Sequence, residues 1–224
     1  AFDRMARSIL SKDVDMRALG MLKFESGSVE TPELFENIYK AGFIMLFFGL
    51  ESANDRILSI IDKGCDQATE KQVLGNSSGA GIWNHLYLFF GFPTEERSEA
   101  EETIRFTMDH SETGKGTIHS IGQSIFSLEK DSAIYHNPAK FKIDRIIHDP
   151  ERDMAIIFDF DIQEGMTRDE VMDVYENFDQ IIEEHFPSRK IWKFLSREHF
   201  LLYLDHYGRE KILDMARNLE GVQV

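Results

Sequence analysis

Two acidic residues follow strongly apolar stretches at corresponding positions. Glu51 ends the run 43–51, and Glu95 stands four residues after the run 86–91. Each run is almost continuously apolar and has a glycine near its end, as expected of a parallel strand that is buried on both faces. Because parallel α/β sheets bind ligands at the carboxyl ends of their strands, the two ends predict a binding rim.

The residue types at this predicted rim suit an organic ligand. The Glu51 carboxylate could accept paired hydrogen bonds from a ribose diol or an ammonium group, or could only favour the dipole of the next helix. The turn 91–95 could offer backbone amides to a purine edge, or be an ordinary strand-to-helix turn. Lys23 and Glu25 end an earlier strand, where the lysine could meet a carboxylate or simply be solvated.

Composition narrows the class of protein. The chain has 224 residues, of which 42% are hydrophobic and 29% are charged, which is typical of a soluble globular protein. A net charge of −15 argues against nucleic acid as the main partner. The single cysteine, Cys65, excludes an internal disulfide and any multi-cysteine metal site, and fits a reducing cytoplasm. No apolar run approaches the ~20 residues of a membrane span, so we expect a cytoplasmic protein without a membrane partner.

Strands and helices alternate through the first two thirds of the sequence. The predicted strands are 16–24, 43–49, 83–91 and 118–128. Helical patterns separate them, which predicts parallel βα units with right-handed crossovers. Past Pro138 the pattern changes to an edge strand over Met154–Phe160 and a long helix after Gly165, with two more helices behind it.

Three of these segments resemble radical S-adenosylmethionine (SAM) enzymes, most closely the group that often carries a cobalamin-binding domain. The segments resemble the fourth, fifth and sixth strands of that family, with the regions that follow them: 41–64, 81–106 and 126–138. The resemblance covers roughly residues 16–145. It implies an α/β fold with a partial (β/α) TIM-like barrel over 1–148 and a mainly helical C-terminal appendage over 149–224.

The resemblance also implies a cofactor and its contacts. The implied SAM-binding residues are Lys23, Glu51, Ser52, Gly91, Phe92, Pro93 and Phe126. Glu51, supported by Ser52, would contact the ribose or methionine end, and Lys23 would pair with the methionine carboxylate. The backbone of 91–93 would hold the adenine, and backbone near Phe126 would close the pocket. No catalytic residue and no metal ligand is assigned in this chain.

In that family a C-x-x-x-C-x-x-C loop binds a four-iron–four-sulfur cluster, and reductive cleavage of SAM yields a 5′-deoxyadenosyl radical that abstracts a substrate hydrogen. This sequence lacks that loop and the first two strands. We therefore expect the C-terminal part of such an enzyme, inactive alone. The resemblance allows cobalamin in the full-length protein and implies a reductant such as flavodoxin or ferredoxin. It leaves open whether the substrate is a small molecule, a peptide or a nucleotide.

Two other functions remain as alternatives. The chain could be a non-catalytic half-barrel scaffold that binds a partner through its acidic helical tail. It could also be an unrelated (β/α) barrel lyase or isomerase that uses Glu51 and Lys23 as acid and base, with activity under air and a bell-shaped pH profile.

Overall fold

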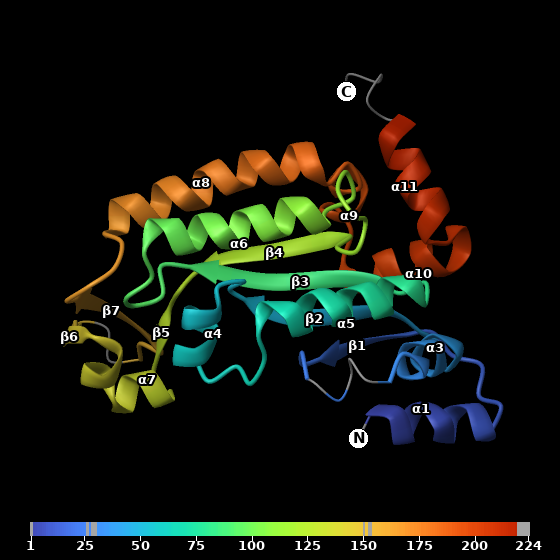
Figure 1. The fold of residues 1–224 in the computed structure, drawn as a ribbon, viewed down its shortest axis with the longest axis horizontal. Coiled ribbons are helices and arrows are strands. Elements are labelled where there is room, and N and C mark those ends of the chain that lie inside the picture. The colour runs from blue at the N-terminus through green and yellow to red at the C-terminus, as the bar shows by residue number, and fades with distance from the viewer. Residues whose placement is uncertain (1, 26, 28–30, 150, 152–153, 219–224) are drawn as a thin grey trace.

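Four parallel strands form the main sheet of the computed structural model, which describes residues 2–25, 27, 31–149, 151 and 154–218. The strands are β1 (Ala18–Leu22), β2 (Phe43–Glu51), β3 (Trp83–Phe90) and β4 (Ser120–Ile125). Their order in the sheet, β1-β2-β3-β4, follows the sequence (Figure 1). All three pairings are parallel, so the carboxyl ends of the strands meet at one edge, here called the rim.

Helices precede and connect the strands, and most of them pack against one face of the sheet, here called the outer face. These helices are α1 (Phe2–Ser11), α3 (Glu33–Lys40), α4 (Asp55–Ile60), α5 (Gln67–Gly79) and α6 (Arg97–His110). Helix α8 (Arg168–His185) lies alongside α6 and contacts β3 and β4 (Figure 1). Three shorter helices follow it: α9 (Arg189–Trp192), α10 (Arg197–Tyr207) and α11 (Arg209–Asn218).

Local sequence signals explain several of these boundaries. The Asn54 side chain accepts the backbone N–H groups of Arg56 and Ile57 at the start of α4, and Asp66 caps α5 in the same manner. Gly42, between α3 and β2, has φ +98°, and a β-carbon there would collide with the Met16 carbonyl oxygen. A glycine is therefore required at that turn.

The main core lies between the outer face and the helices. Its strand residues include Leu46, Phe48, Leu50, Leu86, Leu88 and Phe90. Helix α8 adds Val174, Phe178 and Ile182 to the same core, so the segment predicted as an appendage shares the core between the sheet and its helices. The division into domains at residue 148 stays a prediction.

A second, smaller core covers part of the opposite face of the sheet, here called the inner face. Met45, Phe47 and Trp83 of the sheet pack there against Phe200 and Leu204 of α10. The short C-terminal helices therefore close one end of the inner face, whereas the strand ends at the rim lie outside this cluster.

Beyond the main sheet, three short strands form an antiparallel sheet in the order β5-β7-β6. They are β5 (Leu128–Glu129), β6 (Ile143–Ile147) and β7 (Ile157–Ile162), accompanied by α7 (Ala133–His136) and a 3-10 turn, η1 (Pro138–Phe141). The predicted strand 118–128 is thus divided, because the Phe126 N–H bonds the Phe90 carbonyl and the chain then leaves the sheet. The predicted edge strand is instead central, with β5 and β6 on its two sides.

The α/β prediction is confirmed, and the main sheet is open rather than closed into a barrel. The glycine- and serine-rich stretch 75–78 stays helical within α5, because Ser77 bonds Asn84 at 2.6 Å and Ser78 bonds the Gly116 carbonyl. Among the described residues, no helix combines the length and the apolar character that crossing a membrane requires.

Candidate functional site

Glu51 lies at the rim in an unusual backbone conformation. Its φ is +63°, and the pairing of β2 with β3 shifts register between Gly49 and Glu51. The carboxylate folds back over Gly49, so closely that a β-carbon on Gly49 would collide with Glu51 Oε1. A non-glycine residue with positive φ costs about 1–3 kcal/mol, so the surrounding structure must fix this orientation.

Lys63 holds the Glu51 carboxylate in place. Its Nζ lies 2.9 Å from Glu51 Oε1, and both side chains are partly buried, with 15% of Lys63 and 28% of Glu51 exposed. In the sequence, Lys63 precedes Gly64 and indicates only the end of a helix. Its role arises because α4 brings it back to the rim, which no local pattern encodes.

Ser52 faces away from the rim. Its buried hydroxyl lies 3.1 Å from Thr103 Oγ1 on α6 and accepts the Asn54 N–H at the same distance. Lys63, rather than Ser52, contacts the Glu51 carboxylate. A cofactor role for Ser52 stays a prediction.

The turn 91–95 is held together by its own acid. Gly91 N–H donates to Glu95 Oε2 at 2.6 Å, and Glu95 is fully buried. Burial raises the pKa of Glu95 to about 7, although the Gly91 and Phe92 amides act in the opposite direction. The Gly91 N–H that was predicted to meet a purine is thus already bonded within the protein.

Helix α8 covers this turn closely. A β-carbon on Gly91 would lie 2.7 and 2.8 Å from the two methyl groups of Val171, and Gly91 has φ +80°. We expect Gly91→Ala to lower the free energy of unfolding by roughly 1–3 kcal/mol, measured by urea denaturation. The control is Gly79→Ala at the end of α5, where a β-carbon meets nothing within 4 Å and stability should hold or rise. Equal effects in the two variants would contradict the close approach.

Aromatic rings gather beside the turn. The Phe126 ring lies 5.1 Å from Phe92, and 5.8 Å from both Phe89 and Phe160. Phe92 is buried, as is Pro93, whereas Phe126 is partly exposed. The predicted residues Gly91, Phe92, Pro93 and Phe126 therefore do come together in space.

Lys23 follows the end of β1, in which Leu22 pairs with Phe48 of β2. The register brings Lys23 to the level of Gly49, one strand away from Glu51. Its side chain is exposed and makes no ion pair with any residue that the structure describes. Lys23 and Glu51 thus share the rim without direct contact.

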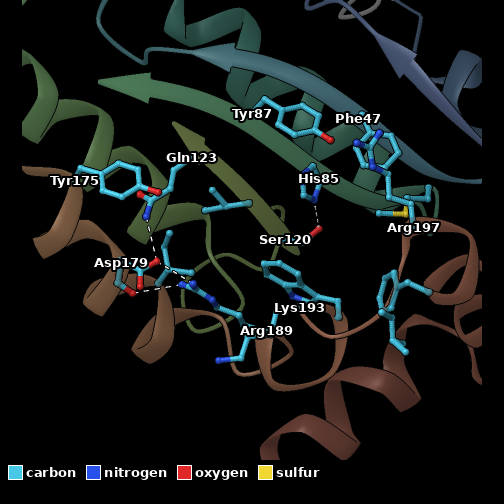
Figure 2. A pocket seen from close by; sticks show the side chains of 16 residues that line it. Phe47, His85, Tyr87, Ser120, Gln123, Tyr175, Asp179, Arg189, Lys193 and Arg197 are labelled. Carbon is cyan, nitrogen blue, oxygen red and sulfur yellow. Dashed lines mark hydrogen bonds and ion pairs between the residues drawn. The ribbon is translucent and has the colours of Figure 1, made fainter. Parts of the chain in front are cut away.

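Below the rim, the inner face holds a cavity of about 360 Å³ (Figure 2). Strands β2, β3 and β4 contribute Phe47, His85, Tyr87 and Gln123 to it, and the α8–α10 region closes it. Sequence reasoning missed this cavity. The only available signal was the alternation of His85 and Tyr87 along a strand that otherwise reads as apolar.

The residues of this chain do not fit an iron–sulfur cluster. No three His, Cys, Asp or Glu side chains within the described ranges are grouped to hold a metal. Cys65 lies beside Glu70, and burial together with that acid raises the pKa of its thiol to about 11. A thiol that resists ionisation is a poor metal ligand.

Comparison with known proteins gives a consistent result for the fold. No family model and no curated protein matches the sequence. Among solved structures, the cobalamin-dependent SAM radical enzyme OxsB matches with a TM-score of 0.59 and 12% identity, over 99% of this chain and 38% of that one. The radical SAM methyltransferase TsrM from Kitasatospora setae gives 0.55 and 14%, over 96% and 49%.

A third similar structure is coproporphyrinogen III oxidase (HemN) from Escherichia coli, also a radical SAM enzyme. Its TM-score is 0.56 and its identity is 11%, over 83% of this chain and 37% of that one. The chain thus spans less than half the length of each of these proteins. The open four-stranded sheet with its outer helices therefore has the fold of a partial radical SAM barrel.

Proposed function

We propose that this chain is the substrate-side part of a radical SAM enzyme and that Glu51 contacts SAM at the rim. The Glu51–Lys63 pair supports this proposal most directly. A carboxylate that is held in front of the strand ends in a strained conformation is typical of a binding site, because such strain does not stabilise the fold. Its oxygens can accept hydrogen bonds from a ribose diol or from the ammonium group of the methionine.

The rim offers SAM an aromatic ring and a cation rather than free backbone amides. The backbone N–H groups of Gly91 and Phe126 are bonded to Glu95 and Phe90, so they are not free for the adenine. The ring of Phe126 is partly exposed, and adenine would stack on it. Lys23, at the same rim, would meet the methionine carboxylate.

When bound beside a reduced iron–sulfur cluster, SAM supplies a 5′-deoxyadenosyl radical for hydrogen abstraction. The ligands of that cluster, and any cobalamin site, would lie outside this chain. Anaerobic isolation of the natural gene product that contains these residues is expected to yield about four iron atoms and four sulfides per chain. No iron after reconstitution would favour the non-catalytic scaffold.

Equilibrium binding tests the rim without the cluster. We expect S-adenosylhomocysteine, measured by titration calorimetry, to bind the 224-residue chain and to bind Glu51→Gln roughly 10- to 100-fold more weakly. The matched control is Glu36→Gln, an exposed acid on α3 paired with Lys40, which should bind as the parent does. Equal affinity in both variants would remove Glu51 from the site.

A further inference from the structure

The cavity below the rim, here called the inner cavity, has more cationic than acidic side chains in its lining, unlike the whole protein. Its lining includes Arg189, Lys193 and Arg197 but only one acid, Asp179, in a chain of net charge −15. Arg189 bonds Asp179 at 2.8 Å, and Lys193 bonds Glu183 at 2.9 Å. Arg197 makes no ion pair within the described part of the chain, so its charge is available to an anion.

Arg197 is also placed over an aromatic wall. Its guanidinium carbon lies 5.6 Å from the centre of the Phe47 ring. Phe47 and Tyr87 are nearly parallel, with ring centres 5.9 Å apart, and Trp192 meets His85 edge to face at 6.3 Å. Rings of this kind favour an aromatic ligand by stacking and edge contacts.

At the far side of the inner cavity, Gln123 presents an acceptor without a partner. Its Nε2 donates to Asp179 Oδ1 at 3.1 Å, and Arg189 bonds the same oxygen, which fixes the amide orientation. Gln123 Oε1 is left buried with no hydrogen-bond donor within the described residues. A buried polar atom without a partner is costly, so this oxygen indicates a donor on a ligand.

Between these ends, His85 presents a donor. Trp83 Nε1–H donates to Ser120 Oγ at 2.8 Å, and Ser120 Oγ lies 2.7 Å from His85 Nδ1. Ser120 Oγ has one proton, which it can donate to Nδ1. We assign His85 the neutral tautomer that this bond allows, with its own proton on Nε2. Burial and nearby Arg197 lower the pKa of His85 to about 3. The buried Nε2–H has no acceptor among the residues described.

Figure 2 shows Arg197 and Gln123 on opposite sides of the inner cavity, with His85 between them. We propose that the inner cavity binds a small aromatic anion that carries a hydrogen-bond donor at the end opposite its charge. The anion meets Arg197 and the His85 Nε2–H, the ring lies against Phe47 and Tyr87, and the donor meets Gln123 Oε1. A volume of about 360 Å³ is at the small end of the range for such sites.

This inference rests on the proposed function and names its substrate class. Tyr87 of the inner cavity pairs in register with Gly49, over which the Glu51 carboxylate folds. A ligand in the inner cavity would therefore lie directly below a cofactor bound at the rim. The two ligands nevertheless contact different side chains, so their binding can be measured separately.

The test uses four compounds in ligand-observed NMR titrations of the 224-residue chain. We expect 4-aminobenzoate to bind, its neutral counterpart 4-aminobenzamide to bind about tenfold more weakly, and benzoate, which lacks the donor, to bind about three- to tenfold more weakly. Competition between phenyl phosphate and 4-aminobenzoate shows whether the inner cavity prefers a phosphate or a carboxylate as the anion. No saturable binding of any of these anions overturns the inference.

Three variants assign the contacts. Arg197→Gln should weaken 4-aminobenzoate about tenfold and leave the amide unchanged. The control Arg105→Gln, which removes an exposed arginine on α6, should change neither. Gln123→Leu should erase the difference between 4-aminobenzoate and benzoate. Equal losses in Arg197→Gln and Arg105→Gln would contradict the inference.

The proposed function and this inference fail in different ways. If the chain binds 4-aminobenzoate in the expected pattern but not S-adenosylhomocysteine, the SAM site is wrong and the inner cavity remains a site for an aromatic anion. If it binds S-adenosylhomocysteine through Glu51 but none of the aromatic anions, only the substrate class is wrong.

Discussion

Replacing Phe178 by alanine is expected to lower the free energy of unfolding by roughly 3–5 kcal/mol. Phe178 lies in α8 and is fully buried. Its ring centre is 5.4 Å from that of Phe90 on β3, at an interplanar angle of 85°. Truncation would leave a void between α8 and the sheet, because the neighbouring strand and helices cannot collapse into it without moving.

The matched control is Phe194→Ala, since Phe194 is 78% exposed and its loss should change stability by less than about 0.5 kcal/mol. Urea denaturation is followed by circular dichroism and by tryptophan fluorescence, because Trp83 lies in the sheet and Trp192 in α9. We expect both probes to report one and the same transition, and Phe178→Ala to shift it equally in both. Two transitions, of which only one shifts, would show that residues 149–224 fold separately.

The sequence predicted the main sheet because its signals are local. Continuous apolar runs identify buried parallel strands, and cap residues such as Asn54 and Asp66 fix where helices begin. The small antiparallel sheet gives only part of such a signal. β7 overlaps the predicted edge strand, whereas β6 was not predicted, because Arg145 and Asp161 face each other across β6 and β7 as an exposed ion pair and give β6 a polar pattern. That β6 and β7 pair across residue 148 was likewise invisible to pattern reasoning.

The candidate site was predictable only for those residues that a local sequence pattern places at the rim. Glu51 could be named because it lies at the end of a strand, and the ends of parallel strands meet at one edge. Lys63 could not, because the return of α4 brings it there. The relay from Trp83 through Ser120 to His85 joins two strands at a separation of 37 residues, and only the β3–β4 register decides that these side chains meet.

The most buried acid of the rim predicts a pH dependence. Glu95 has an ordinary pKa of 4.5 and a pKa of about 7 in the folded protein, so the folded state binds its proton more tightly than the unfolded chain does. The contribution of Glu95 to stability is therefore fully present below about pH 4.5 and is lost as the pH rises through about 7. Between pH 5 and pH 8 this loss should amount to roughly 2–3 kcal/mol.

Glu95→Gln replaces the titrating group with a neutral one of similar shape, which should remove that part of the pH dependence. Urea denaturation at pH 5 and pH 8 measures it as the difference between the two free energies of unfolding. Glu112, whose pKa burial also raises to about 7, still titrates in the variant, so a residual slope is expected. The exposed Glu36→Gln control should keep the full slope. An undiminished slope in Glu95→Gln would mean that the Gly91 and Phe92 amides outweigh burial and keep the carboxylate charged, and the turn 91–95 would then present a negative charge to any ligand at the rim.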